Sequence, residues 1–154
     1  MKRIALLLAV ILLVVFSGQA MAAGSCVQTN VEDVAFDGAM QRRYVTLTCT
    51  GDGTIAAYTF SPSAYGVRGW FLYNITTNPG SSAPTADYDI TLVVDGEDVA
   101  GGLLADRSTS ATQTVAIASS TQGYHMADQS MAITFANEVA SPSTIVLKLR
   151  FTKN

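Results

Sequence analysis

Apolar and polar residues alternate with a period of two over most of the chain. In one example, Val45, Leu47 and Cys49 alternate with threonines, and in another Ile90, Leu92 and Val94 alternate with Asp89, Thr91 and Val93. This period is that of a β-strand with one buried face. The sequence predicts about seven such strands, at residues 44–49, 55–60, 70–76, 88–94, 113–118, 131–136 and 145–151.

Turn-forming residues separate these segments. Asp52-Gly53 predicts a hairpin that brings 55–60 back onto 44–49, and Asp95-Gly96 predicts a second tight turn. The Pro- and Gly-containing stretch 78–84 predicts a loop. Gly101-Gly102-Leu103-Leu104 predicts one helical turn under the sheet, and Asp106-Arg107-Ser108 predicts a polar loop.

No helical periodicity longer than two turns follows the first 22 residues. Short strands separated by turn clusters indicate an all-β fold. We expect a single β-sandwich domain over residues 23–154, with a jelly-roll or Ig-like arrangement. A small closed β-barrel is the second possibility.

The first 22 residues have the features of a cleaved secretory signal. Lys2 and Arg3 precede an uninterrupted apolar run over 4–16, and Ala20-Met21-Ala22 has the small-x-small pattern of a signal peptidase site. The run is shorter than the roughly 20 residues of a membrane-spanning helix, so we expect no membrane span after cleavage. A retained anchor and a lipidated Cys26 are the alternatives. The protein is therefore expected to be exported, to the periplasm or the cell exterior.

The net charge of the mature chain bears on which classes of binding partner are expected. Removal of Lys2 and Arg3 with the signal leaves seven basic against twelve acidic residues, a formal net charge of −5. Nucleic-acid binding depends on cationic side chains that neutralise phosphates, so an acidic chain disfavours it. The same argument disfavours electrostatic binding to an anionic membrane.

Cys26 and Cys49 are the only cysteines, and both lie in the mature part. An even pair in an oxidising compartment predicts a disulfide, which would hold the N-terminal segment against the first core strand. A metal site at the two cysteines would need further ligands, and the chain has a single histidine.

The sequence contains no recognisable set of catalytic residues. His125 is the only histidine, and no G-x-S-x-G motif accompanies it. Half of the acidic residues cluster, at Asp87, Asp89, Asp95, Glu97, Asp98 and Asp106. Three interpretations of this acidic cluster are open. Its members are solvated turn residues, or Asp95, Glu97 and Asp98 form a calcium site, or two of the carboxylates form a pair for glycoside hydrolysis. We expect no catalytic residue and no cofactor.

Aromatic residues offer a second kind of site. Trp70 and Tyr73 lie in the strongest strand segment, where exposed rings could stack on sugars. Adjacent residues of a strand point to opposite faces, so at least one of Trp70 and Phe71 is expected in the core.

The segments 69–73, 77–80, 83–92 and 101–108 resemble those of small β-rich proteins encoded among bacteriophage and prophage structural genes. The resemblance extends from Gly69 to Phe151 and rests on turns and strand patterning. It implies a non-enzymatic virion or assembly role, and it carries over no functional residue. The signal and the cysteines depart from this pattern, because virion parts assembled inside a cell need neither. They point to an exported relative or a domesticated module.

The sequence thus predicts an exported, non-enzymatic structural or interaction protein that self-assembles or associates with a surface, with protein as its partner. A secreted carbohydrate-binding module that binds polysaccharide is the alternative. A glycoside hydrolase-type enzyme is a third hypothesis.

Overall fold

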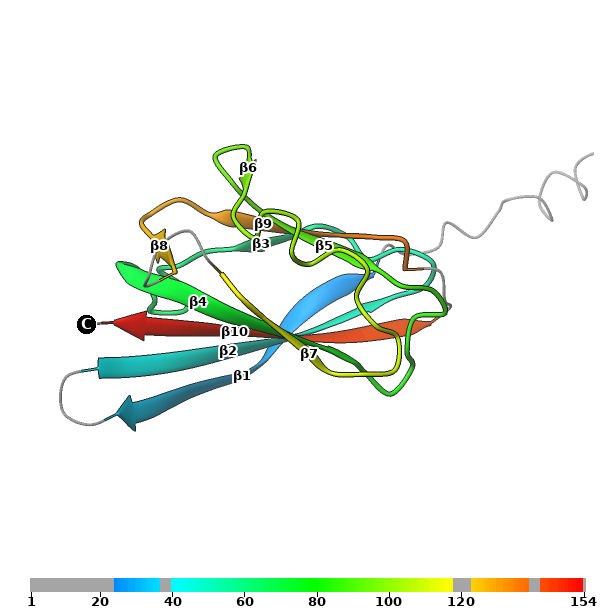
Figure 1. Cartoon of the computed structure of the whole chain (residues 1–154), viewed down its shortest axis with the longest axis horizontal. Helices are drawn as coiled ribbons and strands as arrows, with labels where there is room; N and C mark the ends of the chain where they lie inside the picture. Colours follow the sequence, from blue (N-terminus) through cyan, green and yellow to red (C-terminus); the bar gives the residue numbers. More distant parts are fainter. Residues whose placement is uncertain (1–23, 37–39, 118–122, 139–141, 154) are drawn as a thin grey trace, which may run out of the picture.

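The computed structural model describes residues 24–36, 40–117, 123–138 and 142–153. Two antiparallel sheets pack face to face in a sandwich (Figure 1). All regular elements in the described ranges are strands. None of these residues belongs to a helix that is long and apolar enough to cross a membrane.

The larger sheet has six strands and the smaller has four. The larger runs in the order β1 (Ser25–Phe36), β2 (Met40–Gly51), β10 (Ser143–Lys153), β4 (Trp70–Pro79) and β7 (Gln113–Ala116), and β8 (Tyr124–Met126) also pairs with β4. The smaller runs in the order β3 (Tyr58–Phe60), β9 (Met131–Ala136), β5 (Asp89–Val94) and β6 (Glu97–Asp98).

The strand order is that of a jelly roll. Apart from β1 and β8, the order β2-β10-β4-β7 of one sheet faces β3-β9-β5-β6 of the other, so the chain crosses between the sheets at most connections. This order contains the two Greek keys of a jelly-roll sandwich. The predicted all-β sandwich is therefore confirmed, and the second possibility, a closed barrel, is wrong.

The core fills the space between the two inner faces. The alternating residues expected to be buried are buried: Val45, Leu47 and Cys49 on β2, Tyr88, Ile90, Leu92 and Val94 at β5, and Ile145, Leu147, Leu149 and Phe151 on β10. Each strand turns its other residues away from the core, so the larger sheet also presents an outer face.

The seven predicted strands are all present, and the described ranges add β1, β6 and β8. Asp95 and Gly96 form the predicted two-residue turn, because Val94 pairs with Glu97 and both turn residues have positive φ. β1 was missed because it has no clean alternation of polar and apolar residues.

The hairpin predicted at Asp52-Gly53 is wrong. The chain turns there, but β3 pairs with β9 in the opposite sheet, and β2 pairs with β1 and β10. Both edges of β2 are thus already occupied. Phe60 of β3 instead stacks on Phe151 of β10 across the core, at 5.7 Å between ring centroids.

Two further expectations fail between β6 and β7. Gly101 and Gly102 have φ values of +58° and +77°, which a right-handed helical turn excludes, and the segment forms a series of turns. Arg107 does not lie in a solvated loop, because it is only 5% exposed and its backbone pairs with Tyr88.

The predicted disulfide is present. Cys26 and Cys49 are direct cross-strand partners of β1 and β2, and a bond joins their sulfur atoms. It ties the N-terminal strand to the core sheet, as expected. The predicted signal at residues 1–22 lies outside the described residues.

Candidate functional site

β1 forms a long edge of the larger sheet (Figure 1). It has 12 residues, whereas the strands at the other sheet edges, β7, β8, β3 and β6, have two to four. Its side chains are exposed from Val27 to Asp33 on both faces, because the smaller sheet does not cover it. Of the three large hydrophobic residues that are exposed in the described ranges, two lie on β1, Val27 at 55% and Val31 at 38%.

The backbone of β1 presents hydrogen-bonding groups to this open side. The Cα atoms of Cys26 and Cys49 are 3.9 Å apart, the close spacing of an antiparallel pair that exchanges no backbone hydrogen bonds. The β1–β2 register shifts once, between Gln28 and Asn30, and the extra residue lies on β1. Because the ladder alternates along β2, Val45 and its partner Val31 form a pair of the same kind. The N–H and C=O groups of Val31 therefore point away from β2. We call this open side, from Cys26 to Asp33, the β1 edge.

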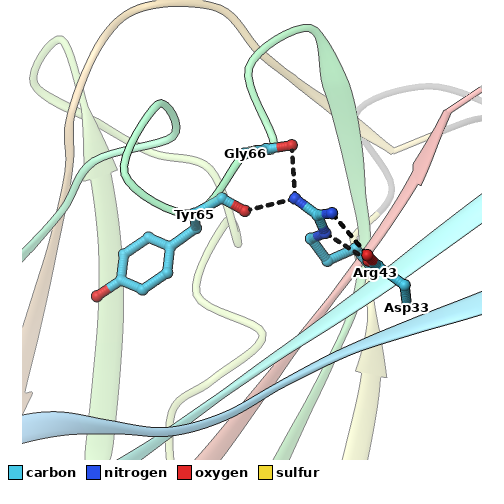
Figure 2. A network of polar contacts seen from close by, with 4 residues as sticks. All are labelled: Asp33, Arg43, Tyr65 and Gly66. Carbon is cyan, nitrogen blue, oxygen red and sulfur yellow. Dashed lines mark hydrogen bonds and ion pairs between the residues drawn. The ribbon is translucent and has the colours of Figure 1, made fainter.

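Arg43 on β2 links β1 to the β3–β4 connection through hydrogen bonds (Figure 2). Its Nε and Nη2 atoms donate to the two carboxylate oxygens of Asp33 on β1, at 2.5 and 2.7 Å. Its Nη1 donates to the carbonyl oxygens of Tyr65 and Gly66 in the β3–β4 connection, at 2.9 and 3.0 Å. The guanidinium also lies over the ring of Trp70, 5.4 Å from its centroid. One side chain thus joins three segments that are distant in sequence.

The Arg43 guanidinium changes the pKa of the Asp33 carboxyl group. The hydrogen bonds from Arg43 lower the pKa of Asp33 below its ordinary value. Around the ion pair, a groove of about 390 Å³ is lined by Asp33, Val34, Gln41, Arg42, Arg43 and Trp70. The alternation of polar and apolar residues does not show that Asp33 and Arg43 are cross-strand partners, so this ion pair could not be predicted from the sequence.

A second group of residues lies on the outer face of the larger sheet. We call it the outer-face cluster, and its members are Arg42 and Tyr44 on β2, Lys148 and Arg150 on β10, and Tyr73 on β4. Lys148 Nζ and Arg150 Cζ are 5.7 and 5.6 Å from the Tyr44 ring centroid, and Arg42 Cζ is 5.8 Å from that of Tyr73. These are cation–π distances.

A β-bulge brings Tyr73 into this cluster. Arg150 pairs with Asn74 and Phe151 with Leu72, so Tyr73 is the extra residue, and both Tyr73 and Asn74 turn to the outer face. Burial and a hydrogen bond with Tyr44 raise the pKa of the Tyr73 hydroxyl, against the opposing effect of Arg42 and Arg150. Uninterrupted alternation predicts neither the bulge nor this cluster.

The two aromatic residues singled out in the sequence have different positions. Trp70 is buried, at 7% exposure, with Arg43 over its ring, so its face is not open to a sugar as it lies. Tyr73 is half-buried on the outer face. Sugar binding by Tyr73 stays a prediction.

The structure does not gather Asp95, Glu97 and Asp98 into a calcium site. The Asp98 carboxylate accepts hydrogen bonds from the backbone N–H groups of Leu92, Ala100 and Gly102. No group of three or more His, Cys, Asp or Glu side chains in the described ranges could hold a metal ion. Asp98 therefore organises the turns after β6.

The remaining candidates for chemistry also have structural contacts. Asp89 accepts hydrogen bonds from the Asp106 backbone N–H and the Asn137 side chain, at 2.8 and 2.7 Å. The exposed His125 packs its ring against Phe71, 5.0 Å between centroids. Asp89 thus has structural partners, as Asp98 does.

A comparison with solved structures gives a distant likeness. No protein-family model matches the chain, and no curated protein matches it. A solved structure titled "Cyanophage Pam1 capsid asymmetric unit" contains a structurally similar chain, with 13% identity and a TM-score of 0.44. The match covers 83% of this chain and 94% of the capsid chain.

Proposed function

We propose that this is an exported, non-enzymatic structural protein that associates with a second copy of itself through the β1 edge. The observation that carries the proposal is the open edge strand β1, whose side chains are exposed on both faces from Val27 to Asp33 and which a disulfide joins to the core sheet. An edge strand with unpaired backbone groups is a template for pairing with another strand.

An identical β1 fits this edge well. Glu32 and Asp33 lie toward one end of the exposed part of β1, so an antiparallel pair places the acidic residues of the two copies apart, whereas a parallel pair would bring them together. Antiparallel pairing around a two-fold axis also closes the assembly at a dimer. It would join the two larger sheets into one continuous sheet.

Export is supported by the sequence and by the cysteine pair. The apolar leader has the form of a signal peptide. Disulfides persist in oxidising compartments and are rare in the cytosol, so the bond between Cys26 and Cys49 favours the periplasm or the cell exterior.

The test is the mass of the protein in solution, measured by size-exclusion chromatography with multi-angle light scattering. We expect a concentration-dependent dimer for the wild-type mature chain. Val31→Pro removes an N–H that points to the open side, so the strand should stay paired with β2 while dimerisation is lost. Val31→Lys places a charge on the same edge and should have the same effect.

Leu103→Lys is the matched control. Leu103 is the third large hydrophobic residue that is exposed among the described residues, at 49%, and it lies in the turns after β6, away from the β1 edge. It should leave the dimer unchanged. A wild-type chain that is monomeric at every concentration would overturn the proposal, as would folded Val31→Pro and Val31→Lys variants that still dimerise.

A further inference from the structure

Some basic side chains of this acidic chain are paired or buried, and others lie on the outer face of the larger sheet. Several cations are engaged elsewhere: Arg43 pairs with Asp33, Arg68 pairs with Asp128 at 2.5 Å, and Arg107 is buried. Lys148 and Arg150 instead lie side by side on the outer face of β10, and within the described ranges neither makes an ion pair with a carboxylate. The outer face is thus locally cationic on a protein of net negative charge.

Tyr44 restrains these two cations. Both lie within 6 Å of its ring centroid, and Arg150 also donates a hydrogen bond to the Asn74 side chain, at 3.4 Å. A cation held over an aromatic ring has fewer conformations to lose when it binds an anion. By register, Glu32 of β1 is opposite Tyr44, on the side away from β4.

A groove begins at these cations. It has a volume of about 320 Å³, crosses β10 and β4, and reaches Thr112 just before β7. Its lining, which is largely apolar by exposed surface, consists of Thr76, Asn78, Thr112, Val146, Lys148 and Arg150. Asn78 donates to the Thr112 hydroxyl at 2.6 Å, and the Thr76 and Thr114 hydroxyls are 2.9 Å apart. The groove therefore offers hydroxyl and amide groups next to two positive charges.

The two cations and the neutral hydroxyl and amide groups beside them favour one class of ligand. A nucleic-acid or polyphosphate chain carries closely spaced charges and needs many cations, which an acidic protein with two cations here does not supply. A uronic-acid polysaccharide carries one carboxylate on each ring among several hydroxyls. Lys148 and Arg150 can bind the carboxylate, and the threonines and Asn78 can hydrogen-bond the hydroxyls.

We propose that the groove between β10 and β7 binds a carboxylated polysaccharide. Lys148 and Arg150 hold the carboxylate of a sugar unit, and Thr76, Asn78 and Thr112 contact its hydroxyls. The groove lies on the face of the sheet and the β1 edge at its margin. Binding is therefore separate from self-association and can be tested in the Val31→Pro variant.

The experiment is isothermal titration calorimetry of the mature protein with polygalacturonate, and with fully methyl-esterified polygalacturonate as the uncharged control ligand. We expect binding to the acid form, weakening as salt is raised, and little binding to the ester. Lys148→Gln/Arg150→Gln should weaken binding by at least about tenfold, because hydrogen bonds to charged groups are among the strongest.

Arg68→Gln/Lys153→Gln is the matched control, since it removes two cations outside the groove and should leave the affinity unchanged. The proposal is overturned if polygalacturonate does not bind, if the ester binds equally well, or if both double variants lose affinity alike. Stronger binding to single-stranded DNA or polyphosphate than to polygalacturonate would also overturn it, in favour of a general polyanion surface.

Discussion

Asp33 and Arg43 face each other across β1 and β2 as a two-pronged ion pair, with both carboxylate oxygens bound by one guanidinium. The same guanidinium holds the Tyr65 and Gly66 carbonyl groups (Figure 2). The position of β1, and hence of the β1 edge, depends on this contact as well as on the disulfide.

Asp33→Asn should lower the free energy of unfolding by no more than about 1 kcal/mol at neutral pH, because the Asp33 side chain is 61% exposed and solvent weakens the pair. The folded pKa of Asp33 is lowered, so its contribution is present above the ordinary value of 3.8 and is lost as pH falls through the folded pKa. Urea unfolding of both proteins at several pH values checks this. A stability difference that persists in strong acid would contradict the assignment.

Gly66→Ala should displace Arg43. A Cβ atom at Gly66 would lie 2.2 Å from Arg43 Nη1, so the guanidinium would have to leave its carbonyl partners. Gly69→Ala is the control, because it also has positive φ, +75°, but meets no atom within 4 Å. We expect Gly66→Ala to be less stable than Gly69→Ala by roughly 1 kcal/mol in denaturant unfolding. Equal losses would mean that Arg43 moves without cost.

Alkaline pH should destabilise the fold through Tyr65. Burial, with a hydrogen bond to the Tyr58 hydroxyl, raises the pKa of Tyr65 from 10.0 to about 12. The raised pKa means that stability is fully present below pH 10 and declines between pH 10 and about 12, where the unfolded chain ionises first. The phenolate absorbance of wild type against Tyr65→Phe measures this titration. Titration of Tyr65 at its ordinary value would contradict the prediction.

The buried Arg107 lacks a carboxylate partner among the described ion pairs, and its Nε donates to the Thr77 hydroxyl at 3.1 Å. Thr77→Val should cost about 1–3 kcal/mol of unfolding free energy, because it leaves a buried charged donor without its acceptor. Arg107→Met should be nearly neutral, since it removes a desolvated charge and keeps an apolar chain of similar length.

In the Arg107→Met background, Thr77→Val should cost much less, and a double-mutant cycle in urea measures the coupling. An equal cost of Thr77→Val in both backgrounds would show that Thr77 does not act through Arg107. Thr77→Ser serves as the control, because it keeps the hydroxyl.

The strands could be predicted from sequence because alternation is a local property. Leu47 on β2 and Leu147 on β10 are buried for the same reason, namely that every second residue of a half-buried strand faces the core. The disulfide could be predicted because the chain has two cysteines and its first residues predict export.

Contacts between residues that are distant in sequence could not be predicted from this alternation. Tyr44 meets Lys148 and Arg150 only because β10 returns to lie beside β2 after crossing from the other sheet. The bulge at Tyr73 and the burial of Arg107 likewise depend on the neighbours that each segment meets. Of the outer-face cluster, the sequence therefore predicted only Tyr73 as a candidate site residue.

The amino-acid pattern alone determined that this protein is built of half-buried strands, where most of them lie, and that Cys26 and Cys49 pair. Only the tertiary structure decided which strands are neighbours, why 55–60 joins the opposite sheet, and which cations and aromatic rings share a face. The physical reason is that the period of a strand is set by its own backbone geometry, whereas its pairing depends on which edges remain open once the two sheets have packed.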